Sequence, residues 1–297
     1  MEVRKAVEAF ILACRADGLS PRTVETYDVR LRRLVERLGD HQIADVSIAD
    51  LRAFAASLYE EDLSIHTVHG HIRALRRFFN WLVEEEIIAD NPAQRIRLPH
   101  LPAASPKAIS AEDARKLLQA ANEMGKDWER KRNRAIILFL ADTGCRLGGL
   151  VRLRTDDLDL EQRVAKVREK GGQWRFVFLK PQTVEALVAW LEARDLVATE
   201  AKDAVWVSRR GTPLTRWGVQ NMLRRLKKCA GVAGPANAHS FRHGFAVSYL
   251  LNGGDLATLS DLLGHHDIET TKQYYARFRK EELQKKHDRY SPVDALL

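Results

Sequence analysis

Apolar residues recur at helical spacing through the first hundred positions of the chain. Val24, Tyr27, Leu31, Leu34 and Leu38 lie three or four residues apart, which places them on one face of a helix. The same pattern predicts helices over residues 3–17, 20–39, 47–60 and 64–88. A serine stands at the start of each of the last three, where its side-chain oxygen can cap exposed backbone N–H groups. Helices joined by such short connections predict a small bundle.

A proline-containing stretch follows this bundle. Residues 98–109 hold three prolines and show no period, which is typical of a linker between domains. Helical spacing resumes over residues 110–123 and 127–140. At 297 residues, the chain is long enough for two domains. We expect them over residues 1–97 and 110–280, with a tail over 281–297.

The strand candidates all lie in the second domain. Residues 164–168 and 174–179 flank the turn sequence Lys170-Gly171-Gly172, which predicts a β-hairpin. A third short strand is expected at 204–208, and helices again from Thr215 onward. The predicted fold is therefore mainly α-helical with a small hairpin or three-stranded sheet.

Composition favours a reduced, cytoplasmic protein that does not engage membranes. Cys14, Cys145 and Cys229 are scattered, odd in number and without zinc-ligand spacing. The first residues lack the apolar run of a signal peptide, and no stretch is long and apolar enough to span a bilayer. We expect no metal and no other cofactor.

Charge is distributed unevenly along the chain, whose net charge is +8. Residues 1–100 carry 14 Lys and Arg against 16 Asp and Glu, whereas residues 101–297 carry 34 against 24. A basic second part suits a polyanionic partner, of which nucleic acid is the commonest.

Six polar residues after position 140 form a candidate phosphoryl-transfer set: Arg146, Lys170, His239, Arg242, His265 and Tyr274. Arginine binds phosphate oxygens through two N–H groups at once and stays charged, so it can stabilise a transferring phosphoryl group. A tyrosine hydroxyl can act as nucleophile if a base or a positive site assists it. The set has no carboxylate cluster for two metals and no Walker-type glycine loop.

The order and local context of these residues resemble the tyrosine recombinase, or phage integrase, family, and within it the Xer-like proteins. Residues 143–147 (Thr-Gly-Cys-Arg-Leu) resemble the family's first arginine box, and residues 239–243 (His-Ser-Phe-Arg-His) its His-x-x-Arg-His box. Leu-Leu-Gly-His at 262–265 followed by Tyr274 resembles its closing box, and the N-terminal helices resemble its core-binding (SAM-like) domain. The resemblance covers nearly the whole chain.

This resemblance implies a site-specific DNA recombinase that cuts and rejoins DNA without ATP or metal. Tyr274 would attack the scissile phosphate to form a 3′-phosphotyrosyl link, with Arg146 and Arg242 holding the phosphate oxygens. Lys170 would protonate the leaving 5′ oxygen, His239 would assist proton transfer, and His265 would hydrogen-bond the phosphate. Tyr275 is the rival nucleophile, His266 the rival of His265, and Lys166 the rival of Lys170.

One position departs from the family pattern. An acidic residue commonly stands three positions after the first arginine, where this chain has Gly149. Without this acid, another carboxylate must orient Arg146. Asp142 and Asp156 are the candidates for that role.

The expected partners are double-stranded DNA with a specific site, further copies of the chain in a tetramer, and a second recombinase or accessory protein. The candidate DNA-binding residues are Arg22, Thr23, His66, Arg73, Arg76, Arg77, Thr215 and Arg216. The two domains would close around DNA as a clamp. The tail over 281–297 would dock on a neighbouring copy or pack on its own domain.

Two other functions share this set of residues. A DNA-binding regulator of the same fold would bind without cutting, and Gly149 is the feature in its favour. A type IB topoisomerase-like enzyme would use the same chemistry to relax DNA.

Overall fold

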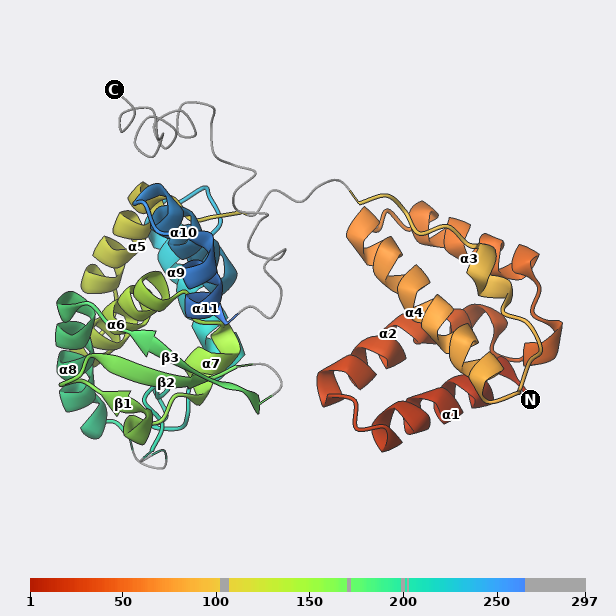
Figure 1. The fold of residues 1–297 in the computed structure, drawn as a ribbon, viewed down its shortest axis with the longest axis horizontal. Helices are drawn as coiled ribbons and strands as arrows, with labels where there is room; N and C mark the ends of the chain where they lie inside the picture. The colour runs from red at the N-terminus through yellow and green to blue at the C-terminus, as the bar shows by residue number, and fades with distance from the viewer. Residues whose placement is uncertain (102–106, 170–171, 199–200, 202, 265–297) are drawn as a thin grey trace, which may run out of the picture. The chain divides into compact units, whose positions relative to one another are not determined.

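The computed structural model describes residues 1–101, 107–169, 172–198, 201 and 203–264, in two compact units, Met1–Ala104 and Ser105–Leu297 (Figure 1). Both units are mainly helical, and the second contains a small three-stranded sheet. The predicted fold class is therefore confirmed. Within the described part of the chain, no helix combines the length and apolarity needed to cross a membrane.

The N-terminal unit is a helical bundle with the predicted helix starts. Its helices are α1 (Val3–Ala16), α2 (Pro21–Leu38), α3 (Ile48–Glu60) and α4 (Ile65–Glu84). Ser20 and Ser64 accept hydrogen bonds from the backbone N–H groups of Thr23 and Thr67, and Ser47 caps α3 in a capping box. The fourth helix ends four residues earlier than predicted, because Glu86 adopts a left-handed backbone conformation (φ 57°).

Aromatic side chains fill the centre of this bundle. Phe10, Phe78 and Phe79 are fully buried. The ring of Phe10 lies 5.6 Å from that of Phe78 and 5.4 Å from that of Trp81, measured between centroids. Pairs at this distance are attractive beyond the apolar area that they bury. The core thus ties α1 to α4, which are far apart in sequence.

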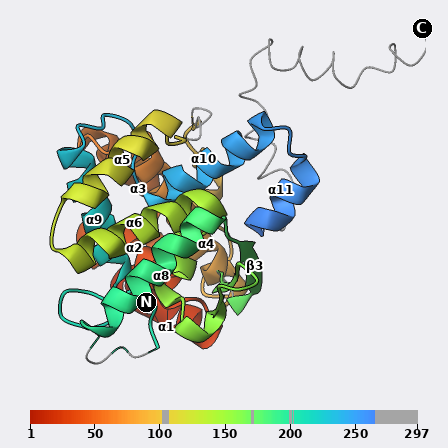
Figure 2. The same cartoon turned by 90° about the vertical axis from the view of Figure 1, so that its left-hand side faces the viewer.

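The second unit surrounds its central helix α6 with other helices. The elements are α5 (Ala111–Glu123), α6 (Asp127–Thr143), α7 (Leu147–Arg152), β1 (Leu158–Asp159), β2 (Val164–Arg168), β3 (Trp174–Phe178), α8 (Pro181–Asp195), α9 (Arg216–Cys229), α10 (Ala238–Leu251) and α11 (Leu256–Leu263). Helices α5 and α8 lie alongside α6, and α10 also packs on it (Figures 1 and 2). Helix α8 was not predicted from the sequence.

The predicted hairpin is confirmed, but the third strand is not where we expected it. Strand β2 pairs antiparallel with β3, with Arg168 opposite Trp174, and the outer strand on the other side is β1. The expected strand at 204–208 is wrong. Three side chains bond to its backbone carbonyls instead: Trp190 to Val205, Arg132 to Val207 and Arg194 to Ala204. With two isolated antiparallel bridges, from Ala204 to Arg154 and from Val207 to Pro213, these bonds satisfy the backbone without a continuous strand pairing.

The two faces of the sheet differ in an unusual way. Ala165, Val167 and Val177 are buried in the core of the unit. The opposite face of β3 exposes Trp174, Phe176 and Phe178, each by half or more. Three aromatic rings exposed on one short strand form an apolar surface that packing within this unit does not cover.

Candidate active site

The connection between α6 and α7 presents Arg146. Helix α6 ends at Thr143, and Gly144 follows in a left-handed conformation (φ 55°) that reverses the chain. A Cβ at Gly144 would lie 3.0 Å from both Leu263 Cδ2 and Phe245 Cδ1, so glycine also permits close packing against α10 and α11. Arg146 is the N-cap residue of α7 and its side chain is 38% exposed.

Helix α10 supplies His239 and Arg242 from one face. Asn237 caps this helix by accepting the backbone N–H groups of His239 and Ser240. His239 and Arg242 are three positions apart, so they project on the same side. Arg242 is buried, and its Nη1 donates to the carbonyl oxygen of Gly144 at 2.9 Å. This bond places α10 next to the connection that carries Arg146.

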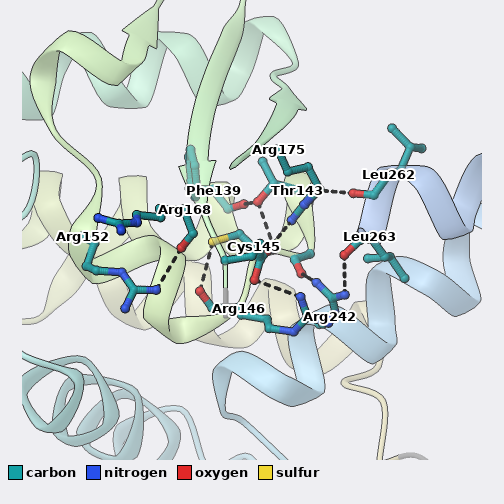
Figure 3. Close-up of polar contacts among 12 residues, drawn as sticks. Phe139, Thr143, Cys145, Arg146, Arg152, Arg168, Arg175, Arg242, Leu262 and Leu263 are labelled. Atoms are coloured by element: carbon teal, nitrogen blue, oxygen red, sulfur yellow. Dashed lines mark hydrogen bonds and ion pairs between the residues drawn. The ribbon is translucent and has the colours of Figure 1, made fainter. Parts of the chain in front are cut away.

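Two arginines hold the end of α11. Arg242 Nη2 donates to the carbonyl oxygen of Leu263 at 2.6 Å, and Arg175 Nη1 donates to that of Leu262 (Figure 3). Cationic side chains favour this end of a helix because its last carbonyls lack partners within the helix. Gly264 then reverses the chain (φ 62°), and a Cβ there would lie 3.0 Å from Arg175 Cδ. Two arginines therefore hold the last described turn of the chain, at the end of α11.

A buried carboxylate joins two of these arginines. Glu169 follows β2, and its Oε2 lies 2.9 Å from Arg146 Nη1 while its Oε1 lies 3.0 Å from Arg175 Nη2. Burial raises the pKa of Glu169, but the hydrogen bonds from Arg146 and Arg175 outweigh this and leave the pKa below its ordinary value. Glu169 is therefore an ionised bridge between α7 and β3.

The positive charge of the group acts on its neighbours. Burial lowers the pKa of His239, and the charges of Arg242 and Arg146 lower it further. His239 is therefore neutral near pH 7 and able to accept a proton. Burial raises the pKa of Cys145 to about 12, so this thiol stays protonated and is not a nucleophile.

The structure thus brings together three of the six predicted residues: Arg146, His239 and Arg242. Lys170, His265 and Tyr274 lie outside the described residues, as do their rivals His266 and Tyr275. Lys166 is described: it lies on the exposed face of β2, with its Nζ 4.9 Å from the centroid of the Trp174 ring. Such a cation–π contact gives Lys166 a partner on the sheet.

The carboxylate that contacts Arg146 is Glu169, and not Asp142 or Asp156, which were expected from the sequence. Asp142 accepts hydrogen bonds from the backbone N–H of Lys180 and the hydroxyl of Thr183, at the start of α8. Asp156 is exposed in the turn Thr155–Asp157. Glu169 takes the place considered for them. It and Arg175 are the site residues that the sequence analysis missed.

Comparison with known proteins agrees with this arrangement. Residues 107–282 match the phage integrase family, and residues 7–89 match the family's N-terminal SAM-like domain. This chain belongs to the phage integrase family. The tyrosine recombinase XerC of Alcanivorax borkumensis is 32% identical over 257 residues, which cover 86% of this chain and 83% of that protein. The tyrosine recombinase XerD of Oceanobacillus iheyensis is 30% identical over 97% of this chain and 98% of that protein.

A solved structure supports the same fold. The Tn1549 transposon integrase, in complex with a circular intermediate DNA, superposes with a TM-score of 0.77 at 22% identity, over 97% of this chain and 99% of that one. The chain is therefore an enzyme of the tyrosine recombinase type, as its sequence motifs predicted.

One hollow in the N-terminal unit is lined by four of the candidate DNA-binding residues. Arg22 and Thr23 of α2 face Arg73 and Arg77 of α4 across a hollow of about 370 Å³, which Arg30 also lines. Arg22 pairs with Glu25, and Arg77 pairs with Glu84. These exposed ion pairs are weak enough for a phosphate to compete with them.

The other four candidates are more dispersed. Arg76 donates to the carbonyl oxygen of Gln94, and His66 is exposed near the start of α4. Thr215 caps α9 by accepting the N–H of Gly218. Arg216 lies against α7, since a Cβ on Gly148 would be 2.8 Å from its Nη2. Since Gly148 is two residues after Arg146, the guanidinium of Arg216 lies close to the start of α7.

Metal ligation has no support among the described residues. No group of three or more His, Cys, Asp and Glu side chains gathers there in a way that fits a metal ion. The three histidines of α4 do not converge: His71 is buried and its Nδ1 lies 3.1 Å from the carbonyl oxygen of Arg30, whereas His66 is exposed.

Proposed function

We propose that this chain is a site-specific recombinase that breaks and rejoins DNA through a 3′-phosphotyrosyl intermediate at Tyr274. The observation that carries the proposal is that Arg146, His239 and Arg242 lie close together. Arg242 bonds the carbonyl oxygens of Gly144 and Leu263, and the charges of both arginines act on His239. These are the described members of a motif set whose remaining members are Lys170, His265 and Tyr274. Family membership supports the reaction class, because the relatives are named tyrosine recombinases.

The reaction is a transesterification at phosphorus. The oxygen of Tyr274 forms a bond to the scissile phosphorus, and the bond from phosphorus to the 5′ oxygen breaks. His239, neutral near pH 7, takes the phenolic proton, and Lys170 gives a proton to the leaving 5′ oxygen. Arg146, Arg242 and His265 stabilise the charge on the non-bridging oxygens. One phosphodiester replaces another, so a second DNA end can reverse the step without ATP or metal.

The arginine-lined hollow of the N-terminal unit supports DNA as the partner. Phosphate contacts by Arg22, Arg73 and Arg77 would release counterions and hold the duplex without reading its sequence. Arg216, beside α7, would add a contact near the scissile phosphate. The DNA complex of the Tn1549 integrase is consistent with this use of the fold.

Covalent capture tests the proposed reaction. The protein is incubated with a library of nicked duplexes of randomised sequence, and the DNA that remains attached to protein under denaturing conditions is recovered and sequenced. We expect an enriched site, an adduct lost in Tyr274→Phe and an adduct retained in Tyr275→Phe. Binding without any adduct would instead indicate a non-cleaving regulator. Adducts without an enriched site, together with relaxation of any plasmid, would indicate a topoisomerase.

Assembly into a tetramer on DNA is part of the proposal. An apolar cavity of about 410 Å³ lies between β3, α10 and α11, with Val177, Phe245 and Leu262 in its wall. The apolar end of the tail over 281–297 is suited to such a cavity, in its own unit or in that of a neighbouring copy. Removing residues 284–297 should abolish pairing of two DNA sites in native gels while leaving single-site binding. Normal recombination by the truncated chain would exclude a role for the tail in trans.

A further inference from the structure

Position 149 lies where an acid would contact Arg146. Arg146 is the N-cap of α7 and Gly149 is the third residue of that helix, whose N–H donates to the carbonyl oxygen of Arg146 at 2.9 Å. A side chain at this position turns back toward the N-cap residue, as in a capping box. Glycine has no side chain, so α7 itself provides no carboxylate for Arg146.

The end of β2 occupies the space beside Gly149. A Cβ there would lie 3.4 Å from Cys145 Sγ and 3.6 Å from both the Arg168 carbonyl oxygen and Val167 Cβ. Strand β2 therefore packs closely against α7 at this point. Glu169 directly follows the last residue of this strand, and its carboxylate accepts a hydrogen bond from Arg146.

Glu169 is buried and held in place by three contacts. Its side chain is 6% exposed, and each carboxylate oxygen bonds one guanidinium, Arg146 on one side and Arg175 on the other. Its backbone N–H donates to the Gln173 carbonyl oxygen at 2.7 Å, which fixes it at the base of the hairpin. A buried carboxylate with two charged donors is held in one geometry.

We propose that Glu169 is the positioning residue for Arg146, replacing an acid at position 149, and that Gly149 and Glu169 form a compensating pair. This inference rests on the proposed function for its effect on rate. Glu169 takes up one nitrogen of Arg146 and fixes the plane of the guanidinium. The exposed part of that side chain is then oriented for the scissile phosphate. Arg175, on the second carboxylate oxygen, links the same geometry to the end of α11.

Three variants test the pair. Glu169→Gln keeps the shape of the side chain and removes its charge, Gly149→Glu adds a carboxylate on α7, and the third variant combines both changes. The expected rate of adduct formation on the captured DNA falls about tenfold to a hundredfold in Glu169→Gln, as for a misplaced reacting group. DNA affinity stays within about threefold, since the proposed role concerns the transition state. The double variant recovers most of the rate.

The control variant changes a glutamate away from the site. Glu161→Gln changes an exposed glutamate in the turn between β1 and β2 and should leave the rate unchanged. An unchanged rate in Glu169→Gln would overturn the inference. So would a loss of rate that Gly149→Glu does not relieve, because that result would indicate general damage to the fold.

A spectroscopic measurement separates this inference from the proposed reaction. In protein labelled with ¹⁵N-arginine, the side-chain resonance of Arg146 is assigned by its loss in Arg146→Lys. We expect it to shift in Glu169→Gln and to move back toward its original position in the double variant. This readout needs no DNA, so it holds even if no adduct forms. An Arg146 resonance that does not respond to Glu169→Gln would refute the positioning role.

Discussion

The two units differ in what they bury. Among the described residues of the N-terminal unit, the buried polar or charged residue is His71, and the rest of the buried set is apolar. The second unit buries the charged residues Arg132, Glu169, Arg194 and Arg242. Burial of charge costs free energy unless every group is paired. The N-terminal unit therefore gains its stability from an apolar core. The second unit keeps buried charges where the proposed site or the bonding of backbone carbonyls requires them.

The largest effect should come from an aromatic residue of the first unit. Phe78→Ala removes a fully buried ring and should lower the free energy of unfolding by about 3–5 kcal/mol. Urea titration with hydrogen exchange read at peptides of α1 and α4 measures it. Leu12→Ala, at a side chain 65% exposed in the same unit, should change the value by less than about 0.5 kcal/mol. Equal effects of the two would contradict an apolar core as the main source of stability.

A smaller loss is expected when a buried cation of the second unit is removed. Arg194 donates to the carbonyl oxygens of Ala204 at 2.7 Å and Ala201 at 2.9 Å. Arg194→Met keeps the volume but leaves these carbonyls without that donor, which should cost about 2–3 kcal/mol. The same titration, read at peptides of α8, measures it.

The matched control is an exposed arginine of the same unit. Arg154 pairs with Asp203 where both side chains are more than 60% exposed. Arg154→Met should cost less than about 1 kcal/mol. If Arg194→Met cost no more than this, the buried guanidinium would not be needed for the segment after α8.

The smallest effect concerns the buried histidine of the first unit. Burial lowers the pKa of His71, and the charges of Arg33 and Arg30 add to this. The unfolded chain therefore binds a proton more readily, so the stability of this unit falls as the pH drops from about 7 through the folded-state pKa. His71→Gln should reduce that pH dependence, measured as urea midpoints between about pH 7.5 and pH 5. His66→Gln, at an exposed histidine of α4, should preserve it; equal slopes in all three proteins would exclude His71 as the cause.

The sequence predicted the helical scaffold well because capping and spacing are local signals. The serine caps at 20, 47 and 64 begin α2, α3 and α4 as expected. The strand predicted at 204–208 was wrong. Side chains from other elements, including Trp190 and Arg132, bond carbonyls of this segment. Strand β1 has only two residues, too few to show a period.

At the site, the motifs predicted Arg146, His239 and Arg242 but not their supporting residues. Glu169 is 23 positions from Arg146, and their contact depends on how closely β2 packs on α7. The position of Arg175 in the strand pattern could have identified it as a site residue. It alternates with Trp174 and Phe176 and so shares the buried face with Val177, where a charged residue needs a specific partner. An inverted pattern of this kind often marks a functional site.

The two carbonyl bonds of Arg242 have a consequence for affinity. A free arginine side chain has conformational entropy worth about 2 kcal/mol at room temperature. Because Gly144 and Leu263 already order this side chain, folding bears most of that loss before any anion arrives. If Arg242 binds the scissile phosphate as proposed, the phosphate meets a guanidinium that is already ordered, and more of the interaction energy contributes to affinity.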